Sequence, residues 1–247
     1  MRSRGPLTLF IALVVLVPVI PVHGGTRVDL KTDRERYLPR REVKVKLLNP
    51  RNQRLRFENP WRIKNTVTGE LVGTQAFEPT QRFVPARGTV TWIWSQQRGH
   101  CATDCHYPDE DLYGTYVGPG RYVAIVRTEV GKFRQVFEIG RYFTIGFDEE
   151  VTDETFVIFS HKRRAIRDLK ADLERPEAKR RIVSGIVRGK EPYNEPWTYT
   201  MGSGSIVLGD AFVEVCDASP QYVENHKRAW MGERWCPWSS FVERAGR

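Results

Sequence analysis

The sequence predicts two domains: an all-β antiparallel sandwich followed by a small α+β domain. Two observations predict this division. Between residues 26 and 148, many short runs alternate apolar and polar residues and are separated by turn residues, as in an antiparallel sandwich. After Glu149 the pattern changes to short apolar runs mixed with helical spacing. The expected limits are 26–148 for the first domain and 153–247 for the second.

Alternation in the first domain has the period expected when one face of a sheet is buried. The predicted strands are 28–30, 43–47, 55–57, 89–94, 122–126 and 133–139. Turn residues separate them, for example Asn49-Pro50 and Gly118-Pro119-Gly120. The longest irregular piece, 96–120, contains two of the four cysteines, and a loop of this length is usually functional or disordered.

The second domain is predicted to run in the order strand, helix, three strands, helix. Ile166, Leu169 and Leu173 fall on one face of a helix, and Ser219 before Pro220 is a helix-start signal. The predicted strands are 156–159, 182–187, 197–201 and 212–215, and the predicted helices are 162–175 and 221–231.

Residues 1–24 have the pattern of a secretory signal peptide. Arg2 and Arg4 form a basic start, residues 7–22 are mostly apolar, and Val22-His23-Gly24 offers a cleavage site. The apolar run is shorter than the roughly 20 residues that span a bilayer, so we expect cleavage rather than an uncleaved anchor. The mature protein is therefore expected to be soluble and secreted or periplasmic, without stable membrane insertion.

The charge is positive and uneven. The formal charge is +9, and it falls to +7 when Arg2 and Arg4 leave with the signal peptide. Between Lys162 and Arg181, nine Lys or Arg face four Asp or Glu, a local +5. Such a segment suits an acidic partner, an anionic envelope or a nucleic acid, and a solvated helix face is the simpler interpretation. We expect a protein or an envelope polymer as the partner, and no nucleic acid.

Four cysteines remain after signal cleavage, and an even number in an exported chain favours disulfides. Three connectivities are possible. We favour Cys101–Cys105 and Cys216–Cys236 because each pair then lies within one domain. The alternative is a zinc site at Cys101 and Cys105 with their neighbouring histidines, but zinc ligands are usually spaced more widely. The acidic stretch 109–111 lacks the pattern of a calcium loop, so no metal or cofactor is expected.

Several motifs of the N-terminal half resemble the intracellular proteinase inhibitor family called BsuPI, over roughly residues 28–146. They are Tyr37-Leu38-Pro39-Arg40-Arg41-Glu42-Val43, Leu48-Asn49-Pro50, Trp92-Ile93-Trp94-Ser95-Gln96-Gln97 and Gly118-Pro119-Gly120-Arg121-Tyr122. The resemblance implies an immunoglobulin-like sandwich and protease inhibition. The loop after Trp94 is longer than that family leads us to expect, and it carries a cysteine pair.

The C-terminal half, from about 155 to 241, resembles the N-terminal domain family named after a slime-mould calmodulin-binding protein. Its motifs are Tyr193-Asn194-Glu195-Pro196-Trp197, Val213-Glu214-Val215-Cys216-Asp217-Ala218, Tyr222-Val223-Glu224-Asn225-His226 and Trp235-Cys236-Pro237-Trp238-Ser239-Ser240. The resemblance implies a fold unit. Calmodulin binding is not expected, since an exported chain would not meet a cytosolic partner.

Catalytic patterns are weak, and an enzyme is not expected. The run Gly202-Ser203-Gly204-Ser205 lacks the spacing of a nucleophile elbow and is typical of a flexible turn. Neither His161 nor His226 has a neighbouring catalytic partner in the sequence. A hydrolase would instead require a cleft with clustered ionisable groups.

Five residues are candidates for a binding surface: Asn194, Trp197, Asp217, Trp235 and Trp238. Exposed tryptophans serve as sugar platforms or interface anchors, whereas buried ones would cover the nearby disulfide. The two polar residues are alternatively buried hydrogen-bonding residues that tie loops to strands. The sequence thus favours a secreted, non-enzymatic binding protein, with protease inhibition as the leading activity and carbohydrate or cell-envelope binding as the alternative.

Overall fold

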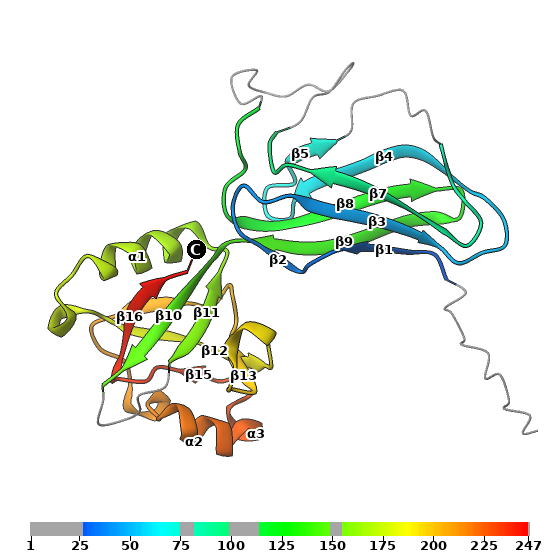
Figure 1. The fold of residues 1–247 in the computed structure, drawn as a ribbon. Helices are drawn as coiled ribbons and strands as arrows, with labels where there is room; N and C mark the ends of the chain where they lie inside the picture. Colours follow the sequence, from blue (N-terminus) through cyan, green and yellow to red (C-terminus); the bar gives the residue numbers. More distant parts are fainter. Residues whose placement is uncertain (1–26, 75–81, 99–113, 149–154, 247) are drawn as a thin grey trace, which may run out of the picture.

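The fold is mostly β-sheet with few helices (Figure 1). The computed structural model describes residues 27–74, 82–98, 114–148 and 155–246. The predicted signal peptide and the predicted Cys101–Cys105 disulfide lie outside the described residues. Within the described ranges, no helix is long and apolar enough to cross a membrane.

The N-terminal part is built from two sheets. Its strands are β1 Asp29–Thr32, β2 Arg36–Tyr37, β3 Val43–Asn49, β4 Leu55–Asn65, β5 Leu71–Thr74, β6 Phe83–Val84, β7 Gly88–Trp94, β8 Gly120–Thr128 and β9 Gly131–Ile139. One sheet has the order β1-β3-β7, and the other has the order β2-β9-β8-β4-β5 with β6 on β4. All neighbours are antiparallel except β2 and β9. Each of the six runs predicted from alternation overlaps one of these strands.

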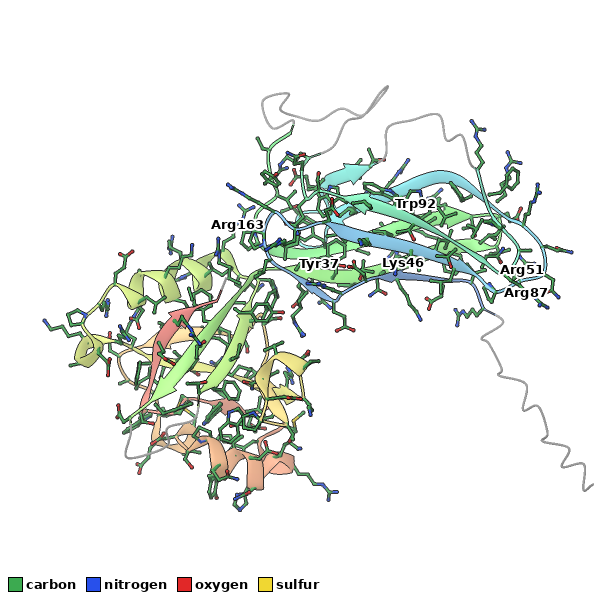
Figure 2. The ribbon with its side chains drawn as sticks, in the orientation of Figure 1. Tyr37, Lys46, Arg51, Arg87, Trp92 and Arg163 are labelled. Atoms are coloured by element: carbon green, nitrogen blue, oxygen red, sulfur yellow. A yellow bond between two sulfur atoms is a disulfide. The ribbon has the colours of Figure 1, made fainter. Side chains whose placement is uncertain are left out.

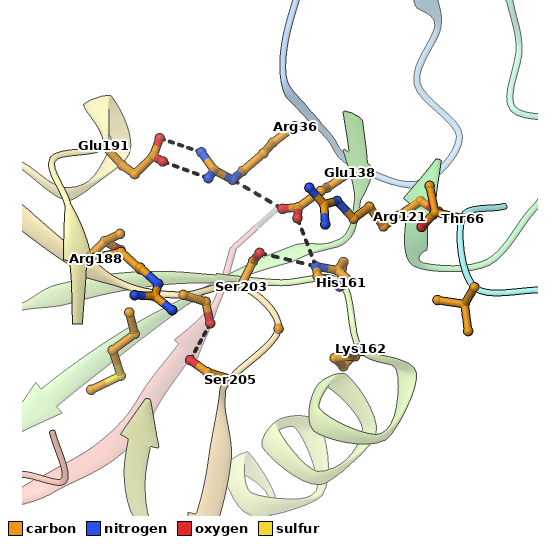
Figure 3. A pocket seen from close by; sticks show the side chains of 15 residues that line it. Arg36, Thr66, Arg121, Glu138, His161, Lys162, Arg188, Glu191, Ser203 and Ser205 are labelled. Atoms are coloured by element: carbon orange, nitrogen blue, oxygen red, sulfur yellow. Dashed lines mark hydrogen bonds and ion pairs between the residues drawn. The ribbon is translucent and has the colours of Figure 1, made fainter. Parts of the chain in front are cut away.

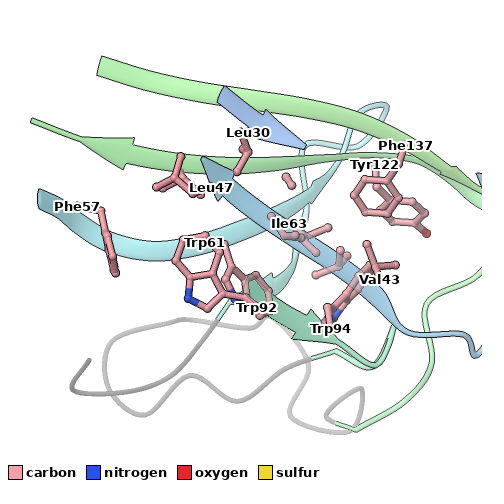
Figure 4. Close-up of a cluster of buried hydrophobic side chains, with 14 of the residues drawn as sticks. Leu30, Val43, Leu47, Phe57, Trp61, Ile63, Trp92, Trp94, Tyr122 and Phe137 are labelled. Atoms are coloured by element: carbon pink, nitrogen blue, oxygen red, sulfur yellow. The ribbon is translucent and has the colours of Figure 1, made fainter. Parts of the chain in front are cut away.

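The first hydrophobic core lies between these sheets (Figure 4). Val45 and Leu47 of β3 are fully buried, whereas Lys46 between them lies on the other face of the strand (Figure 2). Aromatic rings fill the space across the sheets; Phe57 of β4 meets Trp92 of β7 edge to face with ring centroids 5.5 Å apart. Burial of each large apolar side chain contributes roughly 1.5–3 kcal/mol to folding.

The C-terminal part combines strands and helices around a second core. Its elements are β10 Arg141–Phe147, β11 Phe156–Ser160, α1 Arg163–Leu173, β12 Ile182–Gly189, β13 Tyr199–Met201, β14 Val207–Gly209, α2 Pro220–Asn225, α3 Lys227–Trp230, β15 Arg234–Trp235 and β16 Ser240–Ala245. One sheet has the order β11-β10-β16, and in the other β12 pairs with β13, β14 and β15.

The amphipathic pattern of α1 explains how that helix packs. Ile166 and Leu169 are buried and Leu173 is partly buried in the second core, as their spacing predicts. The same face also buries Asp172, whose carboxylate accepts hydrogen bonds from the backbone and side chain of Arg181. This acceptor role ties the end of α1 to the start of β12.

The two cores change over at Gly140, which separates β9 from β10. Ile139 belongs to the first cluster of buried residues and Phe143 to the second. A side chain at Gly140 would come within 2.1 Å of the Ser160 carbonyl oxygen, so the close approach of β11 requires glycine. The sequence places 141–148 in the first domain, whereas β10 packs in the second core because it pairs with β11 and β16.

Two element predictions in the C-terminal part are wrong. The predicted strand at 212–215 is replaced by a 3₁₀ helix at Glu214–Cys216. The predicted helix 221–231 is broken at His226, whose backbone leaves the helical conformation.

A disulfide joins Cys216 to Cys236, as the sequence predicts for this pair. Their Cα atoms are 5.3 Å apart, and the Cys236 amide donates a 2.8 Å hydrogen bond to the Cys216 carbonyl. The bond closes a loop between residues 20 apart in the chain, which contains α2 and α3.

Removing this disulfide by Cys216→Ala with Cys236→Ala is expected to lower the free energy of unfolding by about 3 kcal/mol, because the unfolded chain regains the freedom of the closed loop. Urea denaturation of the double variant and the wild type, both without reductant, measures the difference. Equal unfolding midpoints would show that the staple does not stabilise the fold.

Candidate functional site

A cleft of about 610 Å³ lies where the two parts of the chain meet (Figure 3). Both parts supply its walls. The charged and polar side chains used below come from β2, β8 and β9 on one side, and from the start of α1, the end of β12 and the 202–205 turn on the other.

Arg36 of β2 joins the two parts. Its two terminal nitrogens donate to the carboxylate of Glu191, with Nη2 2.7 Å from Oε1. Its guanidinium also lies over the rings of Phe159 and Tyr193, 5.7 and 5.5 Å from their centroids. Burial alone would lower the pKa of Arg36, but the bond and charge of Glu191 raise that pKa above its ordinary value. Arg36 is therefore a fixed cation that serves the junction.

Glu138, His161 and Ser203 form a chain of polar contacts beside Arg36 (Figure 3). Glu138 Oε1 lies 3.3 Å from His161 Nδ1, and Oε2 lies 3.5 Å from Arg36 Nε. Burial would raise the pKa of Glu138, but the hydrogen bonds of His161 and Ser203 and the charges of His161 and Arg36 hold it below its usual value. Glu138 is thus an ionised acid already engaged by its neighbours.

The contacts of His161 do not match a catalytic triad. Ser203 Oγ lies 3.2 Å from His161 Nδ1, the same nitrogen that faces Glu138. A serine relay requires the serine on one ring nitrogen and the acid on the other. The clustered ionisable groups of this cleft therefore lack the arrangement that would activate Ser203.

Replacing Glu138 by glutamine is expected to cost about 2 kcal/mol of stability at neutral pH, because a charged acceptor in the junction is lost. The folded pKa of Glu138 lies below its unfolded value. Its contribution is therefore complete above the unfolded pKa of about 4.3 and is lost as pH falls through the lower folded pKa.

The stability gap between wild type and Glu138→Gln should thus be constant near neutral pH and close in acid. Denaturation curves between pH 7 and pH 3 check this. Glu243→Gln removes an exposed carboxylate of β16 and should leave the profile unchanged. A gap that widens in acid would contradict the assignment.

Three further cations line the cleft without engagement. Arg121, Lys162 and Arg188 are exposed, and within the described ranges their side chains make no ion pair or hydrogen bond. Helix α1 begins just after Lys162 with no acidic residue in its first turn and no side-chain cap, so its positive end adds to the field. Since Glu138 and Glu191 are already bound, the cleft carries an uncompensated positive charge suited to an anion.

Three of the five predicted binding residues are buried. Trp197 is 3 % exposed and Trp235 is 0 % exposed, so neither ring can present a flat surface to a sugar in this structure. Asn194 is also buried; its Oδ1 accepts from the Val157 amide at 2.6 Å and its Nδ2 donates to the Tyr199 carbonyl at 2.8 Å. These residues belong to the framework of the second core.

The other two predicted residues lie together on the surface. Trp238 is 46 % exposed, and its amide donates a 2.9 Å hydrogen bond to Asp217 Oδ1. They sit beside the disulfide and away from the cleft-lining residues. The role of the five as one binding site stays a prediction.

The cleft residues were largely missed from the sequence. Arg36 and Glu191 are 155 residues apart, and each alone has the pattern of a solvated surface residue. Only His161 and the 202–205 turn drew attention, and the sequence did not indicate that they meet.

The described chain is thus a β-rich protein with a disulfide-stapled C-terminal unit. No group of three or more His, Cys, Asp or Glu among its described residues could hold a metal ion. Residues 140–246 match the N-terminal domain family named after the slime-mould calmodulin-binding protein, which confirms the resemblance of the C-terminal half. The match begins at Gly140, where the two cores change over. No curated protein matches the chain. The inhibitor-family resemblance of the N-terminal half stays a prediction.

Proposed function

We propose that the chain is a secreted, non-enzymatic binding protein that holds an anionic group of its partner in the cleft. The observation that carries this proposal is the set of three exposed, unengaged cations within the described cleft: Arg121, Lys162 and Arg188. The two acids of the cleft are already bound by Arg36 and His161. Ionised groups positioned in this way bind carboxylates, sulfates and phosphates.

The proposal includes an immunoglobulin-like sandwich at 26–148, an α+β domain at 153–247 and a cleaved signal at 1–24. Two facing sheets around one core support the sandwich. The disulfide between Cys216 and Cys236 supports an oxidising compartment outside the cytoplasm.

Thermal unfolding with inorganic phosphate tests the cleft. Phosphate should raise the Tm of the wild type more than sodium chloride of equal ionic strength, because a ligand that binds only the folded state stabilises it. Lys162→Gln with Arg188→Gln should abolish the difference. Lys170→Gln, an exposed lysine of α1, is the control and should keep it. No phosphate-specific shift in the wild type would overturn the proposal.

Protease inhibition is the second candidate, and the described ends of the 96–120 segment favour it. Gln97 and Tyr116 form a β-bridge, and the Arg98 amide donates a 2.8 Å hydrogen bond to Thr115. The side chain of Gln96 is buried and is held by the backbone of Leu38 and Arg40. A rigid base lowers the entropy lost when a segment binds a partner.

Assays of the mature protein against secreted serine and cysteine proteases test this candidate. We expect inhibition at micromolar concentration, weakened in Gln96→Ala because the base of the segment loosens. No inhibition by the wild type across the panel would remove the candidate. The carbohydrate alternative now depends on Trp238 alone among the tryptophans proposed for it, since Trp197 and Trp235 are buried.

A further inference from the structure

The outer face of the larger N-terminal sheet is strongly basic. Along β8, Tyr122, Ala124 and Val126 are buried in the first core, so the alternate residues Arg121 and Arg127 point to the opposite face. The same alternation on β4 and β9 places further cations on this face. We call the set the basic sheet face, and its members are Arg62, Lys64, Arg121, Arg127, Lys132 and Arg134.

The strand register orders these cations into rows across the sheet. Arg127 of β8 lies opposite Lys132 of β9. In the next row, Ile125 lies between Arg62 of β4 and Arg134 of β9. Rows along a strand repeat every about 7 Å, and neighbouring strands are about 5 Å apart.

The next two rows lead towards the cleft. Val123 lies between Lys64 and Val136, and Arg121 lies opposite Glu138. The central strand thus carries an aliphatic strip, and the cations flank it.

Within the described part of the chain, no acid neutralises the basic sheet face. None of its six side chains makes an ion pair or a hydrogen bond there. Glu138 is the acid in these rows, and Arg36 and His161 already engage it. Five of the six cations also act on one another: the charge of Arg134, then desolvation and the charges of Arg127, Lys64 and Arg62, lower the pKa of Lys132. A bound polyanion would relieve this repulsion.

We propose that the basic sheet face binds a linear anionic polysaccharide. Its sulfate or carboxylate groups meet the cations of β4, β8 and β9, and its sugar rings lie over Val123 and Ile125. The regular rows suit a ligand whose charges also repeat along a line. The inference does not rest on the cleft, because Lys162 and Arg188 lie outside this face.

Three other classes of partner fit the described face less well. Single-stranded nucleic acids need aromatic rings on which bases stack, and these rows carry none. Membrane surfaces are bound by large apolar or aromatic anchors together with basic residues, and the apolar residues here are small aliphatics in a strip. Protein interfaces are depleted of Lys at their core and enriched in aromatic residues.

Titration calorimetry with heparin as the probe tests the proposal. The wild type should bind heparin, and the affinity should fall steeply with salt as counterions are released. The triple variant Arg127→Gln, Lys132→Gln and Arg134→Gln should bind about 10-fold more weakly or worse, and the slope of log Kd against log salt should fall by about 2 to 3. These side chains are exposed, so the variant should keep the wild-type Tm within a few degrees.

A matched control separates a site from net charge. Lys31→Gln, Lys44→Gln and Lys46→Gln remove the same charge from the sheet β1-β3-β7, where Lys46 lies on the outer face (Figure 2). This control should keep heparin binding, as should Lys162→Gln with Arg188→Gln in the cleft. Equal loss in the β1-β3-β7 control would reduce the effect to net charge and overturn the proposal.

Two further probes test the class of ligand. Uncharged dextran should not bind. Vesicles containing anionic phospholipid and a single-stranded oligonucleotide should bind more weakly than heparin at equal salt. If either bound as tightly as heparin and lost binding in the same triple variant, the polysaccharide assignment would be wrong.

Discussion

Trp235→Ala is expected to lower the free energy of unfolding by about 4 kcal/mol, the range for deleting a buried tryptophan. The indole is fully buried and meets Phe156, Tyr199 and Phe147, with ring centroids 5.0, 5.4 and 6.2 Å away. Its Nε1 also donates a 2.9 Å hydrogen bond to the Ala218 carbonyl, which would be left unsatisfied. Truncation therefore leaves both a cavity and an orphaned acceptor.

Trp238→Ala is the matched control, three residues further along the chain. Because Trp238 is 46 % exposed, its loss should change stability by less than about 0.5 kcal/mol. Urea denaturation followed by circular dichroism measures both variants. Similar losses in the two variants would contradict the packing of Trp235 described above.

Arg36→Ala is expected to cost about 3 kcal/mol, because two carboxylates would lose their shared cation. Glu191 would lose a two-pronged hydrogen bond and Glu138 its nearest arginine. The rings of Phe159 and Tyr193 would lose the cation that lies over them. Arg36→Lys should restore little, since an ammonium cannot reproduce the planar fork.

Denaturation of the Arg36 variants should be compared with Arg164→Ala. Arg164 has an 88 % exposed side chain and a single 3.7 Å ion pair with Asp168, so its loss should cost less than about 0.5 kcal/mol. Limited proteolysis adds a second measure: Arg36→Ala should be cleaved faster than the control. Equal stability of Arg36→Ala and wild type would show that the junction does not need this residue.

The alternating strands were predictable because their period depends only on local sequence. The runs at 43–47 and 133–139 each lie within an observed strand, since one face of each is buried. The same rule failed at 212–215, where Val213 is 68 % exposed and Val215 is 88 % exposed. There the disulfide at Cys216 and the hydrogen bond from its amide to Val213 hold a turn instead.

Other features depended on contacts that sequence patterns do not report. The predicted helix at 221–231 breaks at His226, whose amide and ring Nδ1 both bond to the Tyr222 carbonyl. Strand β16 was missed because it forms by pairing with β10, far away in the chain. For the same reason the sequence identified His161 without Glu138 or Arg36.

The single residue between β9 and β10 determines how the protein would carry mechanical load. One residue spans about 3.8 Å, so Gly140 leaves almost no slack between a strand of one core and a strand of the other. A stretching force on the two ends of the chain would therefore reach the β8–β9 ladder and the β10–β16 ladder together. The Arg36–Glu191 bridge lies beside that join and would share the load. The molecule should resist extension as one unit, with no early step from an unwinding linker between the two cores.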